Sequence, residues 1–287
     1  MIDYDYLMPK SLEEVFSLLE TYGERATLIA GGTDVMVSIR NKELAPEVLI
    51  SLRELKDLSY IRKDDAYHIG ALTTHRMLET SQLVQQELSA LYDGASKVGS
   101  VQIRNVATVG GNICNAAPSA DTAGPLLVLD AQAVLKGPDG IRKVPLTEFF
   151  TGPSQTVKRN DEVLTEFEIP IENGQFGSAY HKHSRRKAMD LPIIGVAVSL
   201  KLSRQSVENV RIALSVAAPT PIRARKAEEF LKGKTLDEEV LKEAGRIAGL
   251  EASPRDSLRG KAWYRKEMIE TFVPRMAMKA SGRLMRE

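Results

Sequence analysis

The sequence has very little cysteine. Among its 287 residues, Cys114 alone is a cysteine. A single cysteine forms no disulfide within the chain, and it cannot by itself hold an iron–sulfur cluster or a structural zinc ion. We interpret Cys114 as a small buried apolar residue, although its place beside a glycine-rich segment leaves a redox role as the alternative.

Net charge and long apolar runs are also lacking. The formal net charge is +1, so no global field attracts nucleic acid or an anionic membrane. No apolar run approaches the roughly 20 residues that span a bilayer, and the first residues lack the basic and apolar parts of a secretory signal. We therefore expect a cytoplasmic protein that binds no nucleic acid and does not span a membrane.

The usual catalytic and metal-binding patterns are missing as well. The four histidines, His68, His75, His181 and His183, share no metal-ligand spacing with carboxylates or cysteine. No Ser-His-Asp or Cys-His arrangement favours nucleophilic catalysis. The sequence predicts neither a metal site nor a catalytic acid or base in this chain.

Hydrophobic periodicity predicts a mixed chain with two N-terminal units. Residues 1–58 read as helix, strand, turn, helix and strand, and Ser11 with Glu14 forms a capping-box pattern. In residues 59–172, a strand at 66–74 precedes helical segments that Thr74 can cap. A hairpin is signalled at Pro138-Asp139-Gly140.

The last part of the chain reads differently. Three strand-like runs, FGSAYHKHS, PIIGVAVSLKLS and VENVRIALSVAA, precede three helical segments. Pro274 lies inside the last segment and should kink or split that helix. We expect residues 175–287 to form a separate α+β domain with a three-stranded sheet backed by helices.

Two glycine pairs point to a ligand. Gly31-Gly32 and Gly110-Gly111 each lie between a strand-like and a helix-like segment by our interpretation, although glycine is costly inside either element. Neither pair matches a known phosphate fingerprint. There is no Lys or Arg from 26 to 39 or from 105 to 135, so backbone N–H groups and hydroxyls would have to hold an anion there. Two tight turns without a ligand are the alternative.

These loops carry a family resemblance. The segments LIAGGTDVMV and QIRNVATVGGNICNAAPSAD closely resemble the two FAD-binding loops of the medium subunit of molybdenum hydroxylases. That family includes carbon monoxide, nicotinate and xanthine dehydrogenases and aldehyde and quinoline oxidoreductases. The segments IGALTTH, VLTEFEIP, YHKHSRRKAMDLPIIGVAV and SLRGKAWYRKEM look like family segments in the same order, so the resemblance covers nearly the whole chain.

The resemblance implies a two-subdomain FAD-binding fold of the vanillyl-alcohol oxidase type, followed by the C-terminal α+β domain. It implies cofactor contacts from Leu28, Ile29, Ala30, Gly31, Gly32, Thr33, Asp34 and Val35 in the first loop and from Thr108, Val109, Gly110, Gly111 and Asn112 in the second. Asp34 and Asp121 could instead, or also, cap helices.

Four positions outside these loops also align with residues near the cofactor in the family, namely Asp121, Leu164, Lys182 and Leu191. Leu191 falls where relatives place a residue against the isoalloxazine ring. His181 takes the place of Lys182 if the alignment shifts by one residue.

The resemblance implies an oxidoreductase subunit that binds FAD non-covalently. Its partners would be a small subunit with [2Fe–2S] clusters and a large molybdopterin subunit that oxidises the substrate, in a dimer of heterotrimers. FAD would pass electrons to an external acceptor such as NAD, a quinone or oxygen. The alternatives are a self-sufficient flavoenzyme of the same superfamily and a non-catalytic nucleotide-binding module.

Overall fold

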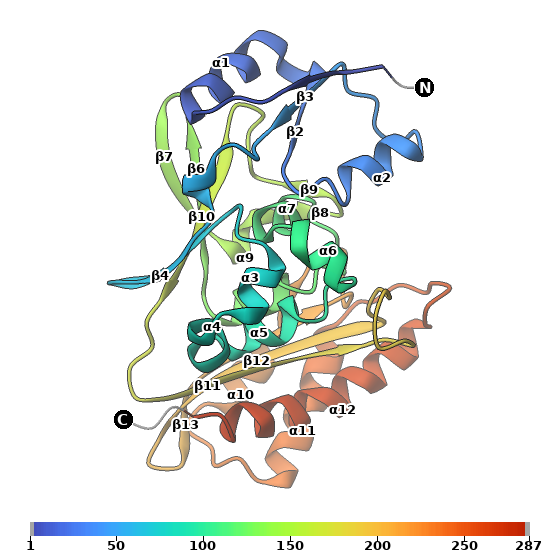
Figure 1. The fold of residues 1–287 in the computed structure, drawn as a ribbon. Helices are drawn as coiled ribbons and strands as arrows, with labels where there is room; N and C mark the ends of the chain where they lie inside the picture. Colours follow the sequence, from blue (N-terminus) through green and yellow to red (C-terminus); the bar gives the residue numbers. More distant parts are fainter. Residues whose placement is uncertain (1–2, 285–287) are drawn as a thin grey trace.

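The computed structural model describes residues 3–284. Three main sheets follow one another along the chain, from the N-terminal unit through a central unit to a C-terminal unit (Figure 1). No helix of the described part of the chain is long and apolar enough to cross a membrane.

The N-terminal unit is a small parallel sheet of order β1-β3-β2 with two helices. Val15 and Leu19 of the first helix are buried against Val48 and Ile50 of the central strand. The elements are β1 (Asp5–Leu7), α1 (Leu12–Tyr22), the 3₁₀ turn η1 (Gly23–Arg25), β2 (Ala26–Ile29), α2 (Val35–Arg40), β3 (Val48–Ser51) and the 3₁₀ turn η2 (Lys56–Leu58).

The central unit is an antiparallel sheet of order β4-β5-β10-β6-β7. Its strands are β4 (Ile61–Lys63), β5 (Ala66–Gly70), β6 (Gln132–Gly137), β7 (Gly140–Pro145) and β10 (Val163–Pro170). Strands β6 and β7 form the hairpin that the Pro-Asp-Gly turn predicts.

Short helices pack on one face of the central sheet. They are α3 (His75–Thr80), α4 (Gln82–Glu87), α5 (Ser89–Ala95), α6 (Val101–Val106), α7 (Val109–Cys114), α8 (Ala123–Val128) and α9 (Leu146–Phe149). The predicted long connection after α9 contains a small hairpin of β8 (Phe150–Gly152) and β9 (Gln155–Thr156).

The C-terminal unit is an antiparallel sheet of order β11-β12-β13-β14 with three helices. The three expected strands are present, and a fourth strand of two residues joins their edge. The elements are β11 (Gln175–His183), β12 (Ile194–Ser203), β13 (Ser206–Ser215), β14 (Ile222–Arg223), α10 (Arg225–Leu231), α11 (Glu238–Glu251) and α12 (Ala262–Ser281).

This C-terminal sheet is buried on both faces. Phe176 and Tyr180 of β11 and Ala197 of β12 pack into the core of the central unit. The alternate residues Ala179 and Val196 pack into the core formed with the C-terminal helices. The sheet therefore lies between α5 and α8 on one side and α10 and α12 on the other, and α11 packs on α10 and α12. Figure 1 shows α12 along the outer side of β12.

Two of the predicted helix caps are present, because their side chains reach a backbone N–H group of the first turn. The hydroxyls of Ser11 and Thr74 accept hydrogen bonds from the N–H groups of Glu14 and Met77, both at 3.2 Å, as expected. Asp34 makes no capping bond to α2, so that expectation is wrong. Asp121 does not cap α8 either, because its carboxylate is engaged by Lys182 and Tyr180.

Three other expectations also need correction. The helical segment after Thr74 is interrupted at Ser81, which is the N-cap of α4. Its hydroxyl accepts a hydrogen bond from the N–H of Val84. The second glycine pair follows a helix rather than a strand, and it forms the first turn of α7. Helix α12 is not split at Pro274, whose ring packs beside Gly245 of α11.

A buried carboxylate ties α5 to the end of the chain. Asp93 accepts hydrogen bonds from Lys279 at 2.9 Å, from Arg283 at 2.7 and 3.1 Å, and from the backbone N–H of Tyr180 at 3.1 Å. Burial opposes ionisation, but the bonds from Arg283, Lys279 and Tyr180 outweigh it and lower the pKa of Asp93.

We predict that Asp93→Asn lowers the free energy of unfolding at pH 7 by about 1.5–3 kcal/mol, the range for a charged hydrogen bond. A lowered folded-state pKa stabilises the fold above the ordinary Asp pKa of about 4 and loses that effect as pH falls through the folded value. The difference between wild type and variant in urea unfolding should therefore shrink in acid.

The control is Glu243→Gln, because the exposed carboxylate of Glu243 also holds an arginine, Arg246, at 2.6 and 2.8 Å. Exposed pairs contribute little, so this variant should unfold like wild type. Equal losses in both variants would contradict the role of Asp93.

Candidate functional site

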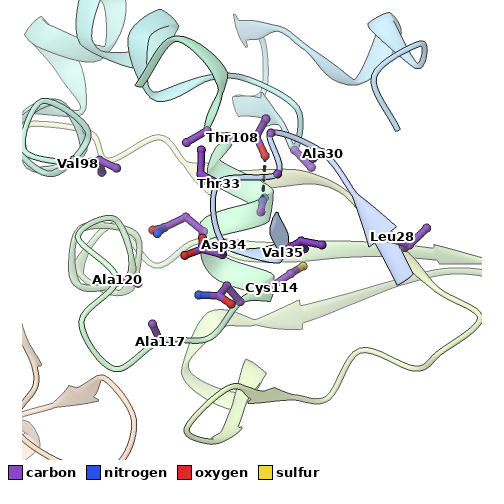
Figure 2. A pocket seen from close by; sticks show the side chains of 18 of the residues that line it. Leu28, Ala30, Thr33, Asp34, Val35, Val98, Thr108, Cys114, Ala117 and Ala120 are labelled. Atoms are coloured by element: carbon purple, nitrogen blue, oxygen red, sulfur yellow. Dashed lines mark hydrogen bonds between the residues drawn. The ribbon is translucent and has the colours of Figure 1, made fainter. Parts of the chain in front are cut away.

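A cavity of about 780 Å³ lies where the three units meet. Its walls come from the first glycine loop, from the segment between Val98 and Asp121, from residues around Leu164, and from the loop after β11. Figure 2 shows the first two of these walls facing each other. The volume is within the range of cofactor pockets.

The first glycine loop offers free donors to this cavity. Gly32 has φ +74°, a conformation that other residues adopt only with strain. Among the described residues, none accepts a hydrogen bond from the backbone N–H groups of Gly31 to Val35. Asp34 also lines the cavity, and burial raises the pKa of its carboxyl. Unpaired N–H groups at a helix start are a ready anion site.

The second glycine loop is different because its backbone donors are already engaged. The N–H groups of Val109 and Gly110 bond to Thr73 O and Ala71 O at 3.0 and 2.9 Å. The N–H of Gly111 bonds to the hydroxyl of Thr108 at 3.1 Å, the bond dashed in Figure 2. This loop can therefore offer a ligand its polar side chains, Thr108 and Asn112, and a close approach.

The glycines are needed first for packing between the loops. A Cβ on Gly31 would lie 2.1 Å from the carbonyl oxygen of Val106, and a Cβ on Gly110 would lie 2.7 Å from Ala71. The two loops and the end of β5 thus meet backbone to backbone. Gly111 is less constrained, since only the Thr108 hydroxyl would be near its Cβ, at 2.9 Å.

A buried ion pair closes another part of the cavity. Lys182 Nζ lies 2.6 Å from Asp121 Oδ2 and donates to Lys97 O at 3.1 Å, while the Tyr180 hydroxyl donates to Asp121 Oδ1 at 2.9 Å. Burial raises the pKa of Asp121 to about 6, against the opposing effects of Lys182 and Tyr180. Lys182, rather than His181, lines the cavity, because strand alternation directs His181 onto Phe272 of α12.

Most residues carried over from the family line this cavity. The exceptions are Ile29 and Val109, whose side chains are buried in hydrophobic cores. Leu191 lines it and is 47% exposed, so it lies near the mouth. The residues that line it are Leu28, Ala30, Gly31, Gly32, Thr33, Asp34, Val35, Thr108, Gly110, Gly111, Asn112, Asp121, Leu164, Lys182 and Leu191.

Three further cations in the wall were missed by the sequence analysis. Lys158, Arg186 and Arg259 come from segments far from the glycine loops. Lys158 is held by Arg159 O at 2.8 Å and Glu162 O at 3.1 Å, and burial lowers its pKa. No local motif marks these residues, because only the packing of the units brings them to the cavity.

Burial favours the neutral forms of two side chains in the wall, the imidazole of His75 and the thiol of Cys114. Burial, with a smaller effect of Arg104, lowers the pKa of His75 to about 4, and neither ring nitrogen has a protein partner. Burial raises the pKa of the Cys114 thiol to about 11. A protonated thiol is a poor nucleophile, which favours the packing interpretation of Cys114.

The arrangement fits an extended, partly anionic cofactor. The cavity lining combines unpaired backbone donors and hydroxyls with cations and with apolar side chains such as Leu28, Val98 and Leu164. No nucleophile paired with a base lies in the cavity among the described residues. The site is built for binding and positioning.

Two family models match the chain. The model described as "FAD binding domain in molybdopterin dehydrogenase" matches residues 2–172, and the model described as "CO dehydrogenase flavoprotein C-terminal domain" matches residues 178–280. Together they cover nearly the whole sequence.

Curated relatives match over the same length. The xanthine dehydrogenase FAD-binding subunit of Escherichia coli O157:H7 is 35% identical over 98% of this chain and 97% of the relative. The nicotinate dehydrogenase FAD-subunit of Eubacterium barkeri is 32% identical over 94% of this chain and 93% of the relative.

A solved structure has the same fold. A chain of carbon monoxide dehydrogenase from Hydrogenophaga pseudoflava superposes with a TM-score of 0.95 at 34% identity, covering 99% of both chains. The resemblance carried by the glycine loops is thereby confirmed. The chain belongs to the family of FAD-binding subunits of molybdenum hydroxylases.

Proposed function

We propose that this chain relays electrons within a molybdenum hydroxylase complex. FAD supplies the redox chemistry when bound, since it can take up single electrons and release two together. A small subunit with [2Fe–2S] clusters would deliver the electrons, and an external acceptor such as NAD, a quinone or oxygen would receive them. The observation that carries the proposal is the first glycine loop, whose free N–H groups line a cofactor-sized cavity.

The two loops have unequal roles in this proposal. The N–H groups of Gly31 to Val35 would hold the diphosphate of FAD, because they are the unpaired donors of the wall. Thr108 and Asn112 would add side-chain contacts from the second loop. Leu164 and Leu191, which both line the cavity, would add apolar contacts, with Leu191 against the isoalloxazine ring.

The Asp121–Lys182 pair would fix the wall between the loops and the C-terminal sheet. Lys182 extends from β11, whereas Asp121 lies directly before α8. A buried ammonium with a buried carboxylate at 2.6 Å holds its position tightly. FAD would then bind to a wall that is already ordered.

The organisation of the chain and the complex is also part of the proposal. We propose two FAD-binding subdomains, 1–58 and 59–172, and a C-terminal domain, 175–287. We further propose that the chain works in the cytoplasm, in a dimer of heterotrimers with the iron–sulfur subunit and a large molybdopterin subunit.

Replacing Gly32 tests the first loop. We predict that Gly32→Ala weakens FAD binding at least about tenfold, because losing one charge-assisted hydrogen bond costs about 1.5–3 kcal/mol and each tenfold is about 1.4 kcal/mol. The measurement is a fluorescence titration of the FAD-free chain with FAD.

The matched control is Gly233→Ala. Gly233 has φ +75°, like Gly32 at +74°, and has open space where a Cβ would be. Both variants carry similar backbone strain, and the tightest new contact at position 32 is with the flexible end of the Ile29 side chain at 3.2 Å. A difference in FAD affinity therefore reports the role of the loop in the cavity. Equal FAD affinities in the two variants would show that the loop is merely a turn.

The Asp121–Lys182 pair can be tested by removing first one charge and then both. Asp121→Asn leaves a buried ammonium unpaired and should destabilise the chain by about 3–5 kcal/mol. Adding Lys182→Met should recover most of that stability but should not restore FAD occupancy. The flavin absorbance at about 450 nm reports the occupancy. Normal FAD occupancy in the stable double variant would show that the pair contributes to the stability of the chain but not to FAD binding.

The relay itself is tested with the purified chain. The FAD-loaded chain alone should not become reduced by aldehydes, purines, N-heterocycles or carbon monoxide. Reduction by the substrate of the complex should appear only after the iron–sulfur and molybdenum subunits are added. Reduction without partners would instead support the self-sufficient flavoenzyme.

A further inference from the structure

The outer face of the central sheet carries a cluster of potential metal ligands. Tyr67 and Ile69 of β5 and Phe167 of β10 point into the hydrophobic core. The alternate residues therefore point to the other face. Strand pairing places Glu168 of β10 directly opposite His68 of β5, with Glu166 two residues before it on the same face.

The spacing of this cluster suits a small cation. One ligand atom each from His68, Glu166 and Glu168 lies within 4.8 Å of the other two. His68 Nδ1 is 3.4 Å from Glu166 Oε2. Tetrahedral ligands at about 2.0–2.2 Å from zinc are separated by about 3.3–3.6 Å. This nitrogen and oxygen are thus already at a coordination distance from each other.

The histidine ring is oriented as a ligand. His68 is 7% exposed, and its Nε2 lies 3.3 Å from Asp65 Oδ1. A carboxylate can only accept, so Nε2 carries the hydrogen. Nδ1 then presents a lone pair, and this buried nitrogen has no hydrogen-bond partner among residues 3–284. The carboxylate–histidine–metal arrangement uses the same second-shell contact to orient its ring.

Charge in the cluster also calls for a cation. The Nδ1 lone pair faces a carboxylate oxygen of Glu166, and two acceptors in contact repel unless a positive charge lies between them. Glu166 has a neutral donor, the Tyr60 hydroxyl. Of the nearby cations, Arg62 is paired with Asp64 at 2.9 Å, and Lys143 donates to Glu168 at 2.5 Å, so an ion would share Glu168 with this lysine. Among the described residues, no lysine or arginine forms an ion pair with Glu166 beside His68 Nδ1.

We propose that His68, Glu166 and Glu168 bind a divalent ion of the zinc class. One imidazole and two carboxylates suit such an ion, with water as the fourth ligand. The site lies outside the FAD cavity but clamps β5 to β10. Strand β5 ends directly before Ala71, and β10 contains Leu164. Both residues line the cavity wall. The ion would therefore stiffen the sheet that supports the cofactor site.

The proposed site departs from the sequence-based prediction of no metal site, which the experiment below tests. His68 and the two glutamates are far apart in the sequence and share no recognisable spacing. Pairing between β5 and β10 alone brings them together.

The test is calorimetric titration of the full-length, FAD-loaded chain with Zn²⁺ after treatment with a chelator. We expect one equivalent to bind to wild type and to raise its melting temperature, because an ion that binds the folded state stabilises it. His68→Gln and Glu168→Gln should each weaken binding at least about tenfold, the effect of disturbing a metal ligand shell. Retained FAD shows that each variant is folded.

The matched control is Glu87→Gln. Glu87 accepts hydrogen bonds from Lys63 and Tyr67, both at 2.5 Å, so it resembles the cluster's glutamates in its partners, but it has no histidine beside it. This variant should bind Zn²⁺ like wild type. The proposal is overturned if wild type binds no Zn²⁺, or if the His68 and Glu168 variants bind as tightly as Glu87→Gln.

A proton between His68 Nδ1 and Glu166 would satisfy the same geometry. Nitrogen NMR of the histidine ring in the presence of Zn²⁺ distinguishes the two cases. If the proposal holds, the ring is neutral and Zn²⁺ shifts its Nδ1 resonance. If the ring is instead an imidazolium whose resonances Zn²⁺ leaves unchanged, the proposal is overturned.

Discussion

The cofactor cavity depends on one close contact between two backbones. Gly31 of the N-terminal unit lies against the carbonyl of Val106, where any side chain would collide. Gly110 makes the same kind of contact with Ala71 at the end of β5. The Gly31 contact joins the N-terminal unit to the central unit, and the Gly110 contact fixes the second loop to the end of β5 within the central unit. The N–H groups of the first loop have no acceptor among the described residues, whereas the second loop has its own donors engaged.

The C-terminal sheet completes that wall because both of its faces are buried. One face packs on α5 and α8 of the central unit, and the other packs on α10 and α12. Alternation along β11 then sends Tyr180 and Lys182 toward Asp121 and sends His181 toward Phe272. A cofactor bound here would be held by all three units, so its binding and their relative placement should depend on each other.

The electrostatics of the cavity favour positioning over chemistry by the protein. His75 and Cys114 are kept neutral by burial, and Asp121 is tied to Lys182. Such a wall can hold a negatively charged cofactor without competing proton transfers. This agrees with a family of FAD-binding subunits, and the proposed ion between the inner strands β5 and β10 would have a supporting role.

The sequence by itself determined the family, the glycine loops, the hairpin after Gly137 and the main strands, because these follow from local patterns and from motifs within short segments. It could not show that Asp34 leaves its helix uncapped, or that the donors of Gly110 and Gly111 are already used. The tertiary structure also decided that Lys158 and Arg259 reach the cavity and that His68 meets two glutamates. The physical reason is that strand pairing and core packing join residues far apart in the chain, whereas propensity and periodicity act only between near neighbours.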